Sequence, residues 1–202
     1  MSRLRAASLP AAALVLVGAV LGVQVAYGGG SFEPLQPADP CAARTVTSQS
    51  DGIDGLTERL VLLGLDNAGC TLGVSREALT LELAQTGTPT DAQIDALHQG
   101  LLQAVDEMAA DGTLPPASAL VDEALDSADL PDFVKTVIRA LPDSVIDAAL
   151  KTDDVLTRSI DGLDIRALLT DIDDQDELND QVDAAVTQAV KDSLVARVRD
   201  LV

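Results

Sequence analysis

Aromatic side chains are nearly absent from this sequence of 202 residues, which contains no tryptophan, one tyrosine and two phenylalanines. Tyr27 and Phe32 lie near the N-terminus, so Phe133 is the only aromatic residue in the rest of the chain. The core must therefore be built from leucine, valine, isoleucine and alanine. Such a core offers no aromatic platform on which sugars or bases could stack.

Basic residues are also scarce, since 13 lysines and arginines stand against 33 aspartates and glutamates, for a net charge of −20. From Glu77 to Phe133 the chain has 12 acidic residues and no lysine or arginine. This balance argues against nucleic acid and anionic lipid headgroups as partners, because both are bound mainly through lysine and arginine. We interpret the acidic face as a solvated surface that keeps the domain soluble, with a basic partner or a divalent cation as the alternative.

Histidine occurs once, as His98, so a zinc site of the usual composition lacks a second histidine or a free thiol. The run Gly73-Val74-Ser75 begins like a nucleophile elbow, but Arg76-Glu77 lacks the closing glycine. Glycine-rich phosphate loops are absent as well. The sequence therefore predicts no enzyme, no cofactor and no metal site, and it predicts that His98 is an ordinary, partly exposed helix residue.

The densest acidic run begins at Asp171 and ends at Asp180. A calcium loop of the EF-hand type needs a glycine at its sixth position and a glutamate at its twelfth. Counted from Asp171, these positions hold Asp176 and Val182, so the loop fails the test. Carboxylates stabilised by the dipole at the start of a helix explain the run more simply, with weak calcium binding as the alternative.

One long apolar run, residues 9–27, sets the N-terminus apart from the rest of the chain. About 20 apolar residues are enough to cross a hydrocarbon core as a helix. Arg3 and Arg5 precede the run, so the positive-inside rule predicts residues 1–8 in the cytoplasm and the remainder of the chain outside. We expect a single-pass membrane anchor, with a cleaved signal peptide and secretion after cleavage near Gly28 as the alternative.

Within the apolar run, Gly18, Gly22 and Ala26 recur at four-residue spacing. Small residues at this spacing let two membrane helices approach closely, so they form a candidate pairing face. A segment rich in alanine and glycine also produces this pattern by chance. The predicted N-terminal helix is the only part of the chain that we expect to contact the membrane.

The next segment, residues 28–40, contains three consecutive glycines and several prolines, which predicts an extended spacer. Cys41 and Cys70 are the only cysteines. Outside the cytoplasm such a pair is more often bridged than free, and the CxxC spacing and basic surroundings of a reactive pair are missing. We expect a structural disulfide between them at the start of one acidic domain, residues 41–202.

Hydrophobic residues of this domain recur at helical spacing, with capping residues and glycines at the expected ends. The pattern predicts an all-α fold, an irregular bundle of about seven or eight helices. The expected helices cover residues 52–63, 75–85, 90–111, 117–127, 132–140 and 143–151, followed by broken turns over 155–172 and a long last helix from Asp174.

Two of these helices have ends or patterns that allow more than one interpretation. Asp51 is expected to cap the first helix and Gly64 to end it, since glycine commonly follows a helix. Ser75 is expected to cap the second helix. Leu79, Leu81 and Leu83 also alternate with polar residues in that second segment, so a short strand is the alternative there.

The third helix has the clearest signals. Thr90 and Gln93 form a capping box, and Gly112 is placed to end the helix. Its inward stripe consists of Ile94, Leu97, Leu101, Val105 and Met108.

A short repeat follows, in which Leu130-Pro131-Asp132 recurs as Leu141-Pro142-Asp143. Proline is well tolerated where a helix starts, so we expect one small duplicated turn-helix unit. The last helix carries a broad apolar face that consists of Leu178, Val182, Ala185, Val186, Ala189, Val190, Leu194, Val198 and Leu201.

Four short motifs occur within residues 39–84: Asp39-Pro40-Cys41, Asp54-Gly55-Leu56, Leu65-Asp66-Asn67-Ala68-Gly69-Cys70 and Gly73-Val74-Ser75-Arg76-Glu77. This stretch resembles a set of uncharacterised actinobacterial proteins that have an N-terminal membrane segment and a helical extracytoplasmic region. The resemblance implies placement outside the cytoplasm and supports the pairing of Cys41 with Cys70. That family has no established activity, so the resemblance implies no catalytic residue.

The predicted membrane segment, together with the absence of a recognisable group of catalytic residues, predicts a non-enzymatic, membrane-anchored protein of the cell envelope. Its acidic domain is expected to bind another protein or to assemble with itself. The alternative is a secreted or anchored domain that binds a small ligand or acts as an enzyme, with a pocket in residues 113–172. This second hypothesis predicts a cavity with convergent polar groups.

Overall fold

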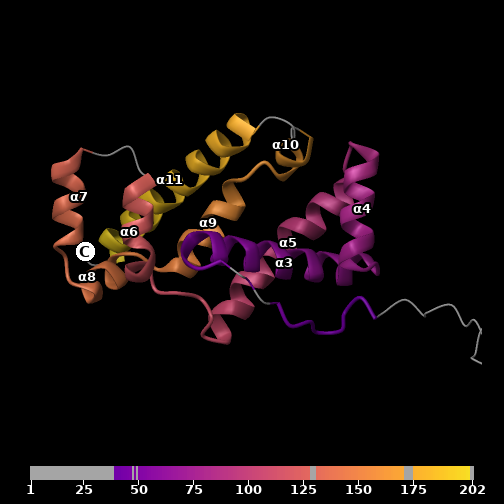
Figure 1. The fold of residues 1–202 in the computed structure, drawn as a ribbon, viewed down its shortest axis with the longest axis horizontal. Helices are drawn as coiled ribbons and strands as arrows, with labels where there is room; N and C mark the ends of the chain where they lie inside the picture. Colours follow the sequence, from indigo (N-terminus) through magenta and orange to yellow (C-terminus); the bar gives the residue numbers. More distant parts are fainter. Residues whose placement is uncertain (1–38, 47, 49, 128–130, 171–174, 201–202) are drawn as a thin grey trace, which may run out of the picture. The chain divides into compact units, whose positions relative to one another are not determined.

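The computed structural model describes residues 39–200 except 47, 49, 128–130 and 171–174. These described residues contain nine α-helices and no strand, so the all-α prediction is confirmed (Figure 1). The helices are α3 Gly52–Leu72, α4 Arg76–Thr86, α5 Asp91–Ala110, α6 Ala117–Ser127, α7 Asp132–Arg139, α8 Asp143–Ala149, α9 Thr152–Gly162, α10 Ile165–Thr170 and α11 Gln175–Asp200.

The predicted anchor, its pairing face at Gly18, Gly22 and Ala26, and most of the spacer lie outside the described residues. None of the helices within the described part is long and apolar enough to span a membrane. Residues from 39 onward belong to one compact unit.

Helices α3 and α5 form the most extensive pairing of the fold, and two glycines allow it. A Cβ atom on Gly64 would lie 2.6 Å from Cδ2 of Leu101, and one on Gly100 would lie 2.4 Å from the carbonyl oxygen of Gly64. Both distances are shorter than any ordinary contact, so the two backbones cross at a separation that only glycine permits. The expectation that Gly64 ends the first helix is therefore wrong, because this residue lies buried inside α3 and serves packing.

The end of α3 lies nine residues beyond Gly64, at Gly73, which adopts the left-handed conformation with φ of 70°. The Gly73 N–H donates to the carbonyl of Cys70, and the Val74 N–H donates to the carbonyl of Gly69. This pair of bonds satisfies carbonyls that the last turn would otherwise leave unpaired. The residue that ends the helix is thus a glycine, as expected, but a later one.

The start of α3 depends on a distant helix. Asp51 occupies the capping position, but its side chain makes no capping hydrogen bond. Instead, the backbone N–H of Ile53 donates to Oε2 of Glu123, on α6, at 2.9 Å. A carboxylate at the positive end of a helix is favourable, so α6 supplies the cap that the local sequence does not.

The next two helices begin as the sequence predicts. The Ser75 hydroxyl accepts a hydrogen bond from the Ala78 N–H, and Thr90 and Gln93 form a complete capping box. Residues 76–86 are helical, so the alternative of a short strand there is wrong. Helix α5 ends at Ala110, and Gly112 follows with φ of 66°.

The core lies along α5, in two adjoining clusters. The first joins α3, α5 and α9 through Leu56, Leu60, Ala104, Val105, Met108 and Ile160. The second joins α3, α4, α5 and α10 through Ala68, Leu79, Ala96, Leu97 and Ile165. The predicted inward stripe of the third helix therefore contributes to both clusters.

The duplicated unit is present as α7 and α8, and Pro131 and Pro142 directly precede these helices. Their backbones match closely, with φ and ψ of −58° and 140° at Pro131 and −62° and 144° at Pro142. After them, the broken turns expected over 155–172 form two separate helices, α9 and α10. This division raises the number of helices in the described residues above the expected seven or eight.

The last helix, α11, packs chiefly on α9. Its most buried residues are Ala189 and Ser193, whereas Val182, Val186 and Leu194 of the predicted apolar face are between 38% and 40% exposed. Small side chains therefore face α9, and only part of the broad apolar face is used in packing.

Candidate functional site

The predicted disulfide between Cys41 and Cys70 is present, with a Cα–Cα distance of 4.6 Å. It links the segment before α3 to the last turns of that helix. The bridge closes over 29 residues of sequence separation, so it restricts a long stretch of the unfolded chain. The segment that it joins to α3 is also held by ion pairs.

Four charged residues form a closed set of ion pairs beside the disulfide. Arg44 lies 2.7 Å from Glu77 and 3.8 Å from Asp66, and Arg76 lies 3.1 Å from Asp66 and 3.6 Å from Glu77. The hydrogen bond to the backbone at the start of α4 lowers the pKa of the Glu77 carboxyl, and the Arg44 guanidinium lowers it further. The set ties the segment after Cys41 to α3 and α4.

An open, shallow cavity of about 460 Å³ lies at the surface between α5 and the turn that follows α9. Its lining consists of Ile94, Asp95, His98, Gly162, Leu163, Asp164 and Ile165. His98 is half-exposed, and its Nε2 atom lies 3.2 Å from Oδ1 of Asp161 on α9. The only histidine of the chain thus joins two helices at the rim of this cavity.

The polar groups of this cavity are the His98 imidazole and the carboxylates of Asp95 and Asp164. An imidazole beside a carboxylate can act as a general base toward a bound molecule or a water. The lining residues contribute no hydroxyl or thiol group. In the described part of the chain, no three histidine, cysteine, aspartate or glutamate side chains are grouped so that they could hold a metal ion.

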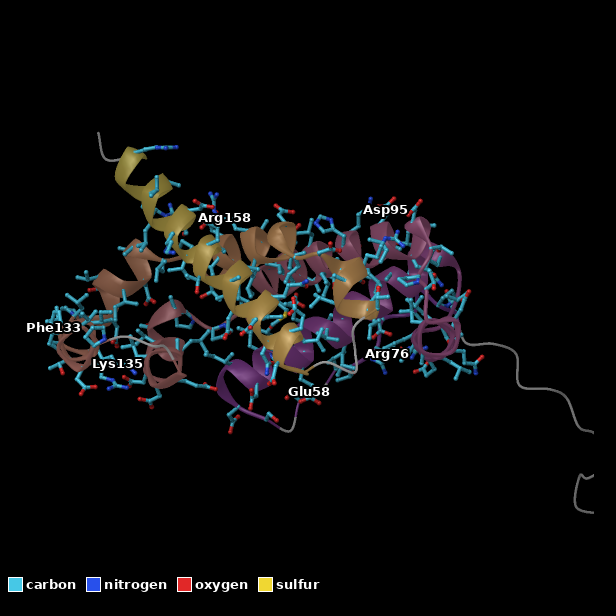
Figure 2. All side chains as sticks on the ribbon, turned by 90° about the horizontal axis from the view of Figure 1, so that it is seen from above. Glu58, Arg76, Asp95, Phe133, Lys135 and Arg158 are labelled. Atoms are coloured by element: carbon cyan, nitrogen blue, oxygen red, sulfur yellow. A yellow bond between two sulfur atoms is a disulfide. The ribbon has the colours of Figure 1, made fainter. Side chains whose placement is uncertain are left out.

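A second feature is an exposed apolar stripe on α7 and α8. Its members are Phe133, Val137, Leu141 and Val145, which are 72%, 61%, 42% and 47% exposed. They recur at four-residue spacing through two helices and the turn between them. Figure 2 labels Phe133, the only aromatic residue of the domain, on α7. We call these four residues the α7–α8 stripe.

Polar contacts with α6 hold the two short helices in place. Arg139 of α7 lies 3.1 Å from Asp122, and it also pairs with Asp126. In α8, Asp147 accepts hydrogen bonds from the backbone N–H and the hydroxyl of Ser118, at 2.8 and 3.0 Å. Helix α7 has no fully buried residue, but apolar side chains of α7 are half-buried and Ile146 of α8 is buried, so apolar packing also positions the two helices.

The sequence contains the four-residue spacing of the α7–α8 stripe, but the Leu-Pro-Asp repeat suggests a different correspondence between the two helices. Aligning the two Leu-Pro-Asp units pairs Val134 with Val145, which directs attention away from the four-residue spacing. In the structure, Val134 is half-buried whereas Val145 is exposed. The exposure of an apolar residue depends on which helix covers it, and that information is not local.

No protein-family model matches this chain, and searches among curated proteins and among solved structures find no similar protein. The resemblance of residues 39–84 to actinobacterial envelope proteins therefore stays a prediction. The stripe and the cavity are therefore the features from which a function can be inferred.

Proposed function

We propose that this chain is a non-enzymatic interaction protein of the cell envelope, anchored by residues 9–27 and carrying its helical domain outside the cytoplasm. The domain works by binding another protein. The single observation that carries this proposal is the α7–α8 stripe. Four large apolar side chains exposed on α7, on α8 and in the connection between them are costly to leave in water, and such clusters commonly mark interaction surfaces.

The arrangement of the domain supports a division of roles. The disulfide and the ion pairs around Arg44 secure the end that leads to the predicted spacer. The stripe lies on other helices, α7 and α8, which contact α6. One part thus serves attachment, and another presents an apolar surface.

A site-specific photocrosslinker tests the proposal in the organism that makes the protein. A benzoyl-phenylalanine at Val137 should give crosslinked products in the membrane fraction. The matched control is Val61, a valine of α3 that is 43% exposed. Products from Val137 but not from Val61 support the proposal, and monomer alone from both positions contradicts it.

The predicted location is tested by measuring the mass of the protein in membrane and culture-supernatant fractions. An intact N-terminus in the membrane fraction supports the anchor. A product that starts near Gly29 in the supernatant would instead make this a secreted binding protein.

A second candidate function, binding of a small ligand, is favoured by the cavity beside His98. Asp95 and Asp164 line it with His98, so its polar groups suit a small cation or amine. Titration with a set of small ammonium compounds should shift the NMR signals of the His98 imidazole. Unchanged signals at millimolar concentrations would remove this candidate.

A further inference from the structure

We infer that the partner of the α7–α8 stripe is an amphipathic helix that carries lysine or arginine beside its apolar face. This inference rests on the proposed function and adds the chemistry of the partner. It is argued from the spacing of the stripe, from the charges around it and from the charge of the whole chain.

The shape of the stripe suits a helix. Phe133 and Val137 are one turn apart on the same face of α7, whereas Leu141 lies in the connection to α8 and Val145 lies on α8. An opposing helix also presents apolar side chains at three- and four-residue spacing, so its ridge can lie along Phe133 and Val137. A stripe of this kind provides contact along a line rather than a deep socket.

The charges near the stripe are mainly negative. Residues 117–127 and 131–149, which form α6 to α8, contain six carboxylates and two cations. One cation, Arg139, is already paired with Asp122 and Asp126. The other, Lys135, is two residues from both Phe133 and Val137 and therefore lies on the opposite side of α7 (Figure 2).

Exposed carboxylates begin both helices of the stripe. Asp132 directly precedes Phe133, whereas Asp143 is two residues before Val145 and therefore lies on the opposite side of α8. A positive side chain at the margin of an incoming helix would meet Asp132. Charge complementarity of this kind selects a partner and its register more than it adds affinity.

The same charges disfavour the other occupants of the stripe. A second copy of the chain would bring another net charge of −20 against the first. Anionic lipid would be repelled in the same way. A basic helix is the occupant that gains from both the apolar row and the charges.

The test uses the full-length, disulfide-bonded protein in nanodiscs of phosphatidylcholine. Two synthetic helices of about 18 residues serve as probes, with the same leucine positions at helical spacing and with either lysine or glutamate elsewhere. Fluorescence anisotropy measures binding, and empty nanodiscs provide the background. The lysine peptide should bind at least about tenfold more tightly than the glutamate peptide at low salt.

Two sets of variants assign the binding to the stripe. The double variant Phe133→Gln with Val137→Gln should weaken binding of the lysine peptide about tenfold, whereas Val61→Gln should leave it within about twofold. Asp132→Asn should weaken it about two- to fivefold and flatten its salt dependence, whereas Asp143→Asn, on the far side of α8, should have a smaller effect. Thermal unfolding checks that each variant is folded.

Three outcomes would overturn the inference. Equal binding of both peptides would mean that charge does not select the partner. Sedimentation of a dimer that Val137→Gln dissociates would identify a second copy as the occupant. Crosslinks from Val137 in cells, together with no binding of the lysine peptide, would retain the proposed function and reject this partner class.

Discussion

The α3–α5 pairing and the α6–α8 region solve the same problem, holding helices together without aromatic residues, in different ways. In the first, glycines bring two backbones into contact, and buried alanine, leucine and methionine fill the space around them. In the second, α7 has no fully buried residue, and Arg139 pairs it with exposed aspartates of α6. Close packing makes the first region a fixed frame, whereas polar attachment leaves the apolar side chains of the second available to a partner.

Removing the disulfide should produce the largest effect on the fixed frame. The double variant Cys41→Ala with Cys70→Ala should lower the free energy of unfolding by about 3–4 kcal/mol, because the bridge restricts the unfolded chain. Urea denaturation with and without reductant measures the loss. The variant itself should be insensitive to reductant, and equal stability of all samples would show that the bridge is dispensable.

Crowding the glycine crossing should have the next largest effect. Gly100→Ala places a Cβ atom 2.4 Å from a backbone oxygen of α3, so the two helices must separate. The expected loss is about 2–3 kcal/mol in the free energy of unfolding. Gly162→Ala is the matched control, because its Cβ atom would meet only Ala185 at 3.9 Å. Equal stability of the two variants would contradict the close crossing.

Releasing α8 should have a smaller effect that stays within the second region. Asp147→Ala removes both acceptors of Ser118 and should cost about 1 kcal/mol. The amide signals of α6 and α8 should shift in NMR spectra while those of α3 and α5 remain. Asp143→Ala, a loss of the same charge from α8, should cost at most about 0.5 kcal/mol. NMR shifts spread evenly through the domain would contradict the difference between the α6–α8 region and the α3–α5 pairing.

The smallest expected effect is the pH dependence of stability that comes from Glu77 and its ion pair with Arg44. The pKa of Glu77 is lowered in the folded protein, so its stabilising contribution is present above the usual carboxyl pKa and is lost as the pH falls through the lowered value. Arg44→Gln should raise the pKa of Glu77 part of the way back, as followed by NMR of the carboxyl carbon. Arg199→Gln, on α11, removes the same charge and should leave the Glu77 midpoint unchanged.

Local signals in the sequence predicted much of the fold. The caps at Ser75 and Thr90, the proline starts of α7 and α8, and the disulfide all depend on residues close together or on a single pair, and all are confirmed. Gly64 shows the limit of this reasoning. A glycine in a helical pattern can end the helix or admit a neighbour, and only the position of α5 decides between them.

The candidate sites were harder to predict because they depend on contacts between distant segments. His98 meets Asp161 across 63 residues of sequence, and neither residue has a local pattern that indicates the other. The exposure of Phe133 and Val137 likewise depends on what α6 leaves uncovered. The sequence supplied the apolar spacing of the stripe, but it could not say which face of α7 would remain in solvent.

The bond from Ile53 to Glu123 makes the first turn of α3 a reporter of events on α6. The amide hydrogen of Ile53 can exchange with solvent when this bond opens, by motion of the Glu123 side chain or of α6, so its exchange rate reports how often the contact between α6 and α3 is broken. A partner that tightens the α6–α8 region should slow the exchange, and one that pulls the region outward should speed it. The amide of Ile53 on α3 can thus report both that a partner has bound and whether binding moves α6 toward α3 or away from it.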